Sequence, residues 1–206
     1  MDHRKTLVRR AYDRVADSWG QARRSLPAPG RERAWIERFL ARMPDQATVL
    51  DLGCGSGAPI LADVLSRGHR VVGVDFSREQ LREAQGRCPD ARLVLADIGD
   101  VAFTAGSFAG IIAYDSLWHV PRDEHQRVFE GMHTWLVHGG AALLTVAAAD
   151  GELFTELMGA PVFYDAWPEA TSVAMLQKAG FHIVGRDFQP VEGKSDGHVI
   201  VLATAG

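Results

Sequence analysis

Short apolar runs alternate with stretches of helical periodicity along most of the chain. Apolar residues spaced at i, i+1, i+4 and i+8 predict a helix over about residues 4–18, and a second helix is expected over about 31–43. Two prolines and a glycine within residues 25–30 separate them. From Thr48 onward the apolar runs have the length of strands, and strands are expected at residues 48–52, 70–75, 92–96, 109–114, 141–146, 181–188 and 198–204.

Helix signals fill most of the intervals between these strands. Ser77 and the three residues after it form a capping box, which predicts a helix start. Residues 122–137 fit a helix closed by Gly139, and residues about 169–179 fit a helix closed by Gly180. Residues 151–168 follow no regular period and are expected to form an insert.

Near-continuous apolar strands separated by helices are typical of a parallel sheet that is covered on both faces. Residues 192–197 are polar and contain two glycines, which suits a hairpin rather than a helical crossover. The predicted fold class is therefore three-layer α/β, with a mostly parallel sheet and an antiparallel last strand.

The composition of the 206 residues is that of one ordinary globular domain, with 47% hydrophobic and 23% charged residues. Two cysteines give no disulfide framework, so a reducing, cytoplasmic setting is expected. The start of the chain lacks the apolar stretch of a signal peptide. The most apolar segment, residues 136–149, is too short to span a bilayer, so no membrane partner is expected.

Charge is distributed unevenly along the chain. Residues 1–43 hold 11 of the 22 Lys and Arg and 5 of the 26 Asp and Glu, a net charge of +6; the remainder carries 11 − 21 = −10. A domain that is acidic outside a short arm is a poor general nucleic-acid binder, because duplex affinity depends on a basic face. The arm either attracts an anion or forms a solvated helix face. Arg23 and Arg24, for example, either bind an anionic acceptor or lie on that solvated face.

The strongest chemical signal follows the first expected strand. Gly53, Gly55 and Gly57 alternate with other residues, which allows a tight turn and a close approach of the backbone to a ligand. The spacing is neither a dinucleotide fingerprint nor a lysine-bearing phosphate loop. Asp51, just before the glycines, would repel a pyrophosphate and attract an ammonium. This favours a nucleotide that carries an amino acid.

Two further strand ends supply nucleoside-binding groups. Asp75 ends the second strand, where a carboxylate can accept hydrogen bonds from both ribose hydroxyls, and Phe76 beside it offers an apolar face to a base. Asp97 and Ile98 follow the third strand, where the carboxylate suits an adenine amino group. Ligands of open α/β sheets bind at such strand ends.

With these motifs the chain resembles the class I S-adenosylmethionine-dependent methyltransferases of small-molecule type. The resemblance rests on residues 49–57, 72–77, 96–98 and 118–121, and extends from the segment around Tyr12 to the turn before Phe181. It implies a Rossmann-like, seven-stranded sheet with an antiparallel seventh strand and an N-terminal helical cap. The expected organisation is one domain, 1–206, with an arm (1–44), a cofactor-binding half (45–150) and an acceptor-side half (151–206).

The resemblance also implies site residues. Those expected to bind the cofactor are Asp51, Gly53, Cys54, Gly55, Gly57, Asp75, Phe76, Asp97, Ile98 and Tyr114. Those expected on the acceptor side are Tyr12, Trp19, Trp118 and Tyr164. Tyr12 and Trp19 are seven residues apart and share a helix face, so they either face the site or pack against the sheet.

His119 is the candidate general base, because an unperturbed histidine titrates near neutral pH. The competing interpretation is a histidine hydrogen-bonded to backbone at a helix entry. No metal site is expected from the spacing of histidines and carboxylates. Residues 114–117 lack the Asn/Asp-Pro-Pro-aromatic motif of members that methylate nucleic-acid amines, so no nucleic-acid partner is expected.

The sequence therefore predicts an enzyme, a methyltransferase that uses S-adenosylmethionine and methylates a small molecule, most readily at a hydroxyl or carboxylate oxygen. The alternatives are a small-molecule N-methyltransferase, an NAD-dependent oxidoreductase, and a non-catalytic cofactor-binding protein that acts through a partner. Asp75 would suit NAD, but the third glycine of its fingerprint and a Tyr-x-x-x-Lys pair are absent. The sequence specifies neither the acceptor nor the oligomeric state.

Overall fold

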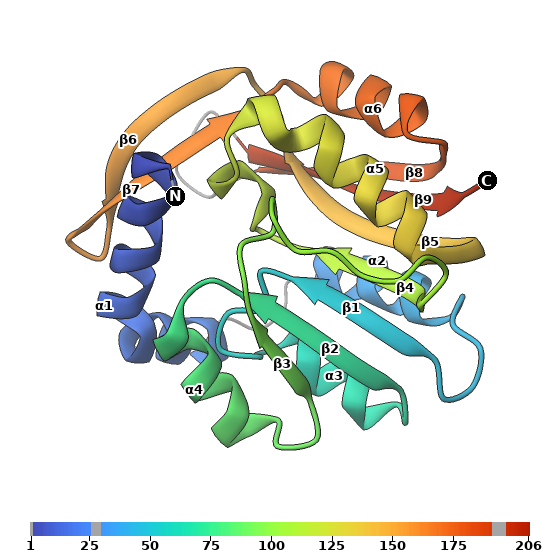
Figure 1. The fold of residues 1–206 in the computed structure, drawn as a ribbon, viewed down its shortest axis with the longest axis horizontal. Helices are drawn as coiled ribbons and strands as arrows, with labels where there is room; N and C mark the ends of the chain where they lie inside the picture. The colour runs from blue at the N-terminus through green and yellow to red at the C-terminus, as the bar shows by residue number, and fades with distance from the viewer. Residues whose placement is uncertain (1, 26–29, 191–196) are drawn as a thin grey trace.

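The computed structural model describes residues 2–25, 30–190 and 197–206, and its main feature is a seven-stranded sheet in the order β3-β2-β1-β4-β5-β9-β8 (Figure 1). Strand β9 is antiparallel to both of its neighbours, and the strands from β3 to β5 run parallel. This confirms the predicted mostly parallel sheet with an antiparallel last strand. The strands are β1 (Thr48–Leu52), β2 (Arg70–Asp75), β3 (Arg92–Leu95), β4 (Phe108–Ala113), β5 (Leu136–Ala147), β8 (Phe181–Pro190) and β9 (Gly197–Ala205).

Helices cover both faces of this sheet. The side chains of β1 alternate between two cores: Val49 packs with α2 (Gly30–Leu40), α3 (Ile60–Ser66) and α4 (Arg78–Arg87). Leu50 and Leu52 point to the opposite face and pack with α5 (His125–Trp135) and α6 (Glu169–Lys178). The buried alternation within one strand thus produces the predicted three layers.

Helix α1 (His3–Ser25) lies outside this sandwich, across the carboxyl ends of the strands (Figure 1). It packs against α4 and against a separate two-stranded hairpin. Ala11 and Val15 of the helix form a small apolar cluster with Ala160 and Val162 of the hairpin. Helix α1 is therefore a cap over the carboxyl ends of the strands, whereas α2, the other helix of the arm, packs on a face of the sheet.

The predicted helix over residues 122–137 is wrong at both ends. Two short 3-10 turns, η1 (Leu117–His119) and η2 (Arg122–Glu124), precede α5, which ends at Trp135. Leu136 is buried and pairs with Phe108 of β4. Residues 136 and 137, which continue the helical pattern, therefore belong to the sheet. Gly139 (φ +74°) lies within β5, near an irregular register, rather than closing a helix.

The expected irregular insert is a β-hairpin, made by β6 (Gly151–Leu157) and β7 (Ala160–Ala166). Its turn consists of Met158 and Gly159, both with positive φ, the geometry that matches strand twist in a two-residue loop. Methionine is an unusual residue for such a turn, and β6 is exposed along almost its whole length. Neither feature gives a recognisable strand signal.

Other boundaries differ by a few residues. Helix α1 continues to Ser25, beyond the predicted residue 18, and α2 ends at Leu40 rather than at 43. The break at 26–29 and the loop at 191–196 lie outside the described residues, but the antiparallel pairing of β8 with β9 confirms the hairpin connection. None of the helices in the described part of the chain is long and apolar enough to cross a membrane.

Candidate functional site

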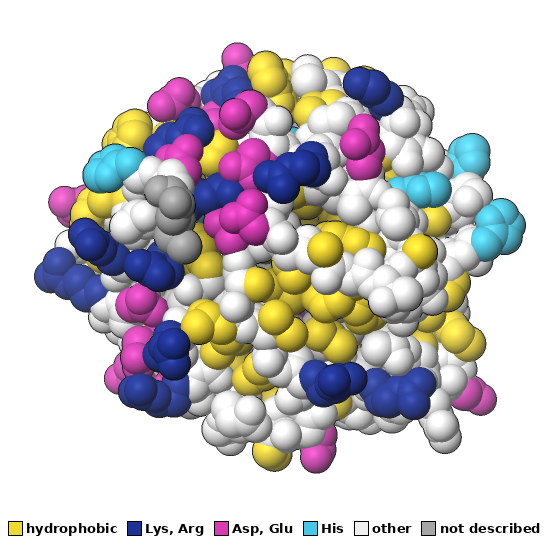
Figure 2. Space-filling view, in the orientation of Figure 1, with side chains coloured by type: hydrophobic (Ala, Val, Ile, Leu, Met, Phe, Trp, Pro, Cys, Tyr) yellow, Lys and Arg dark blue, Asp and Glu magenta, His cyan; other side chains and the backbone are white. Residues whose placement is uncertain are grey.

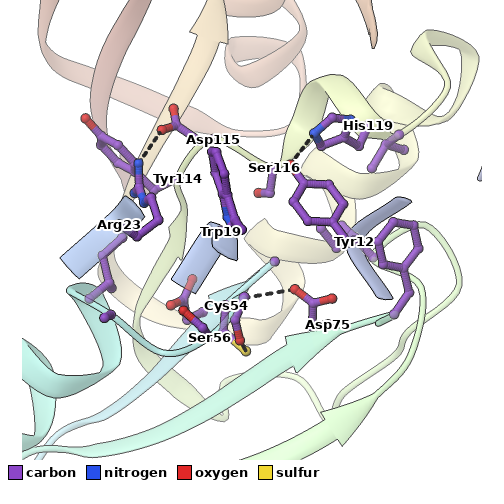
Figure 3. Close-up of a pocket in the computed structure, with 18 of the residues that line it drawn as sticks. Tyr12, Trp19, Arg23, Cys54, Ser56, Asp75, Tyr114, Asp115, Ser116 and His119 are labelled. Atoms are coloured by element: carbon purple, nitrogen blue, oxygen red, sulfur yellow. Dashed lines mark hydrogen bonds and ion pairs between the residues drawn. The ribbon is translucent and has the colours of Figure 1, made fainter. Parts of the chain in front are cut away.

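A cleft of about 840 Å³, measured out to open solvent, lies between α1 and the carboxyl ends of the strands (Figure 3). We call the strand ends with the glycine loop its floor, and α1 with the β6–β7 hairpin its roof. Most of the residues that the sequence predicted for the site line this cleft. They are Tyr12, Trp19, Asp51, Gly53, Cys54, Gly55, Asp75, Phe76, Asp97, Ile98, Tyr114 and His119.

The glycine loop has no room for side chains at its start. Gly53 has φ +83°, and a Cβ atom there would lie 2.3 Å from the Cβ of Ser116. The amides of Gly53 and Cys54 both donate to the carbonyl of Val74 in β2, which fixes the turn against the sheet. The loop therefore presents backbone to the cleft because glycine removes the side chain that would block it.

Asp75 is oriented by its neighbours' backbone. The amide of Gly55 donates to one carboxylate oxygen at 2.9 Å, and the amide of Ser77 donates to the other at 2.8 Å. Burial raises its pKa to about 6, although these hydrogen bonds act in the opposite direction. Each oxygen retains a lone pair, so the carboxylate can still accept hydrogen bonds from a ligand.

Asp51 is more strongly perturbed. Asp51 is 2% exposed, and no hydrogen bond from a described residue offsets the burial of its carboxylate. Burial, together with the charge of Asp75, raises its pKa to about 7, and the charge of Arg23 only partly opposes this. A ligand cation at this position would restore the ionised form, which makes the site suitable for an ammonium.

Asp97 is held by the arm. Its Oδ1 accepts hydrogen bonds from the amide of Gly99 at 2.8 Å and from Nζ of Lys5 at 3.2 Å, and Lys5 also binds Glu124 at 2.7 Å. The other oxygen, Oδ2, is buried without a hydrogen-bond partner among the described residues. An unsatisfied buried oxygen in a cleft-lining residue marks a place for a ligand donor.

His119 lies between Tyr12 and the hairpin. Its Nδ1 is 2.9 Å from the carbonyl oxygen of Phe163, and its Nε2 is 2.9 Å from the hydroxyl of Tyr12. Burial lowers its pKa to about 4. Both ring nitrogens therefore have hydrogen-bond partners, and the partner of Nε2, Tyr12, also lines the cleft. This geometry disfavours the expected direct proton transfer to His119.

Three residues predicted for the site do not line the cleft. Gly57 faces Ala84 and Cys88, so it shapes the loop against α4. Trp118 turns toward His198 and lines a separate, smaller cavity beside α5. Tyr164 packs against His119, with ring centroids 4.7 Å apart and planes tilted by 45°, and does not itself line the cleft.

The cleft also contains Asp115 and Ser116, which were not predicted as site residues, and Arg23, for which the sequence left an anion-binding and a solvated role open. Arg23 at the end of α1 forms an ion pair with Asp115 at 3.3 Å, and lies over the ring of Trp19. Asp115 and Ser116 directly follow β4, a position that could have identified them; nothing in the sequence pairs Asp115 with Arg23 or Lys5 with Asp97. The side chain of Arg24 lies outside the described residues.

No cluster of three or more potential metal ligands occurs in the part of the chain that the structure describes. Cys54 contributes its backbone to the cleft, while its thiol is directed at Gly73 and has a pKa raised by burial. The chemistry of the cleft therefore rests on carboxylates, backbone amides and aromatic side chains.

Several known proteins that this chain is similar to are methyltransferases. Residues 49–140 match a family model described as a methyltransferase domain. A probable 18S rRNA (guanine-N(7))-methyltransferase of Dictyostelium discoideum is 33% identical over 55% of this chain and 42% of its own length. A trans-aconitate 2-methyltransferase of Variovorax paradoxus is 32% identical over 65% and 52%. The chain thus spans about half the length of these relatives.

Solved structures agree on the fold. The 1,6-didemethyltoxoflavin-N1-methyltransferase of Burkholderia thailandensis superimposes with a TM-score of 0.74, at 21% identity, over 97% of this chain and 88% of its own. The sheet order and the glycine loop at its strand ends define a class I methyltransferase fold. Residues 49–140 thus match a methyltransferase domain, and the chain has the fold of the S-adenosylmethionine-dependent methyltransferases.

Proposed function

We propose that this protein transfers a methyl group from S-adenosylmethionine to a small-molecule acceptor, at an oxygen atom. The observation that carries the proposal is the convergence of Asp51, Asp75 and Asp97, from the ends of three neighbouring strands, on one cleft covered by α1. The proposal treats residues 1–206 as one methyltransferase domain, in which the arm forms the roof.

The floor fits the cofactor in three places. The cofactor ammonium would offset the burial of Asp51, the ribose hydroxyls would donate to Asp75, and the adenine amino group would satisfy Oδ2 of Asp97. Phe76 and Ile98 would flank the adenine. The backbone at Gly53, Cys54 and Gly55 would line the methionine part, with Tyr114 near the sulfonium.

The bound cofactor supplies an activated methyl group. What the protein adds is alignment of the acceptor with that group and exclusion of water. Tyr12 and Trp19 contact each other edge to face, with ring centroids 6.1 Å apart, and cover the cleft from α1. This aromatic cover supports an acceptor that is enclosed rather than laid along an open surface.

Surface charge also supports a small acceptor. On the face shown in Figure 2, basic side chains over α1 and the start of α5 are interleaved with acidic ones. Two of these basic side chains are ion-paired: Arg4 binds Asp2, and Arg127 binds Glu124. A polymer of phosphates would bind best to basic side chains that lack such partners.

The relatives act on different acceptors, one on an rRNA guanine and one on trans-aconitate according to their names, so the test must include both classes. We would supply methyl-labelled S-adenosylmethionine to the protein with a low-molecular-weight metabolite extract or with total rRNA. We expect the natural protein to label the small-molecule fraction and the Asp75→Asn variant to leave it unlabelled. Mass spectrometry of the product then assigns the methyl group to oxygen or nitrogen.

Three outcomes would contradict the proposal. Labelled rRNA with an unlabelled metabolite fraction would replace the small-molecule acceptor, and N-linked methyl groups would overturn oxygen as the target. Tight binding of S-adenosylmethionine with no label in either fraction would favour the non-catalytic alternative.

A further inference from the structure

The hydrogen-bond chain from Phe163 through His119 to Tyr12 has a fixed direction. A carbonyl oxygen cannot donate, so the imidazole must carry its proton on Nδ1, facing Phe163. The burial that lowers the pKa of His119 to about 4 keeps the ring neutral at physiological pH. Its Nε2 is then a pure acceptor, and the hydroxyl of Tyr12, 2.9 Å away, must donate to it.

This direction decides what Tyr12 can offer to the cleft. A phenol has one proton and two acceptor lone pairs, and here the proton is committed to His119. Tyr12 lines the cleft, so its oxygen meets a bound molecule only as a hydrogen-bond acceptor. A group placed against it must bring its own proton.

Two donor side chains in the cleft are also engaged. Ser116 donates its hydroxyl proton to the carbonyl of Leu52 at 2.7 Å. Arg23, the cationic side chain among the described cleft-lining residues, is paired with Asp115. An anionic group placed against Tyr12 would therefore face an oxygen lone pair instead of a donor, and the hydration it loses at that contact would not be replaced.

We propose that the Tyr12–His119 pair selects a methyl acceptor that presents a proton to Tyr12, a hydroxyl or an N–H group, and rejects an ionised carboxylate at that position. This rests on the proposed function: it removes the carboxylate from the proposed oxygen acceptors and leaves the hydroxyl, while an N–H acceptor would keep the Tyr12 contact but revise the proposed oxygen target. Tyr12 is then the contact residue, and His119 is a positioning residue that acts through it.

The first test measures the tautomer directly, without any acceptor. In protein with ¹⁵N-labelled histidine, we expect His119 to show a protonated Nδ1 and an unprotonated Nε2 between pH 6 and 8. The Tyr12→Phe variant should shift the Nε2 resonance and leave Nδ1 unchanged. An Nε2-protonated ring, or an Nε2 signal indifferent to the Tyr12→Phe change, would overturn the proposal.

The second test measures selection with three probes of similar size, phenol, aniline and benzoate, titrated into protein saturated with S-adenosylhomocysteine. Phenol or aniline should bind at least tenfold more tightly than benzoate, and Tyr12→Phe should weaken the protic probe by about fivefold, as expected for one lost hydrogen bond. The comparison of phenol with aniline distinguishes oxygen from nitrogen acceptors.

The matched control is Tyr164→Phe, because Tyr164 packs against the same imidazole without a hydrogen bond to it. It should leave both the Nε2 resonance and the probe affinities unchanged. Each of three results would overturn the inference. They are benzoate that binds as tightly as phenol, equal effects of the two tyrosine variants, and no binding of a protic probe at millimolar concentration. Failure of S-adenosylhomocysteine to bind would instead contradict the proposed function.

Discussion

The floor and the roof of the cleft are built in different ways. Each floor carboxylate ends a strand or follows it closely, so its place is set by the sheet itself. The roof residues come from α1 and β7, and long-range contacts bring them to the cleft: Tyr12 reaches His119, and Lys5 reaches Asp97. The floor is thus defined locally, while the roof depends on the packing of distant segments.

The two regions also differ in how their polar groups are satisfied. Burial raises the pKa of Asp51 to about 7 and that of Asp75 to about 6, and neither carboxylate forms an ion pair with a described residue, whereas Asp97 pairs with Lys5. Roof residues have protein partners, as in the pairs Arg23–Asp115 and Tyr12–His119. The floor is therefore suited to a cationic ligand that donates hydrogen bonds, and the roof is held in place by contacts within the protein.

The largest effect on the floor is expected from Gly53→Ala. The new methyl group would collide with Ser116 and would sit at a left-handed φ, which alone costs about 1–2 kcal/mol. We expect the free energy of unfolding to fall by roughly 3 kcal/mol or more, since overpacking adds about 1–3 kcal/mol, and binding of S-adenosylhomocysteine to be lost in calorimetry.

Gly68→Ala is the matched control, because Gly68 has φ +78° and no atom within 4 Å of the new methyl group. It isolates the backbone strain from the collision. Two results would contradict the claim that position 53 has no room for a side chain: equal losses of stability in the two variants, or normal ligand binding by Gly53→Ala.

The next largest effect should come from the buried cation of the roof. The Lys5 side chain is 5% exposed and binds Asp97 and Glu124, and removing one partner of a buried ion pair typically costs about 3 kcal/mol. We expect Lys5→Met to lower the free energy of unfolding by about that amount in urea denaturation. Arg127→Met removes an exposed cation from the same Glu124 and should cost less than about 0.5 kcal/mol.

If the two variants are equally stable, the roof is not anchored by Lys5. A Lys5→Met protein that loses stability as expected but binds S-adenosylhomocysteine as tightly as the natural chain would show that the anchor stabilises α1 without supporting Asp97.

A smaller, pH-dependent effect should separate the floor from the rest of the molecule. The folded-state pKa of Asp51, about 7, lies above its ordinary value of 3.8, so its contribution to stability is present below about pH 4 and is lost as the pH rises through 7. Asp51→Asn cannot ionise. Relative to the natural protein, the variant should gain about 2 kcal/mol of stability between pH 5 and 8.

Thermal denaturation without ligand at the two pH values measures this difference. Asp45→Asn, an exposed carboxylate outside the cleft, serves as the control and should show no such gain. A flat difference for Asp51→Asn, or a gain that grows toward low pH, would contradict an uncompensated carboxylate in the floor.

The contrast between floor and roof also explains what the sequence could predict. The strands have clear apolar runs, so the sheet, its antiparallel last strand and the carboxylates at its strand ends could be predicted. The glycine spacing predicted a ligand-binding loop equally clearly, although Gly57 packs against α4 and does not line the cleft.

The roof had weaker signals. The helical spacing placed Tyr12 and Trp19 on one face, which their edge-to-face contact confirms, but not the hydrogen bond from Tyr12 to His119. The exposed strand β6 and the Met158 turn gave no strand pattern. The resemblance implied Trp118 on the acceptor side, whereas the side chain in the turn η1 lies against His198. Contacts across the fold are not encoded in local periodicity.

The central claim is that the floor binds S-adenosylmethionine through strand-end carboxylates. Calorimetric titration with S-adenosylhomocysteine and with NAD, using the natural protein and Asp75→Ala, tests it most directly. We expect micromolar binding of S-adenosylhomocysteine, no binding of NAD, and about a 100-fold loss of affinity in the variant, from two lost hydrogen bonds to a charged group. Binding of NAD alone, or affinity for S-adenosylhomocysteine unchanged by Asp75→Ala, would contradict the account.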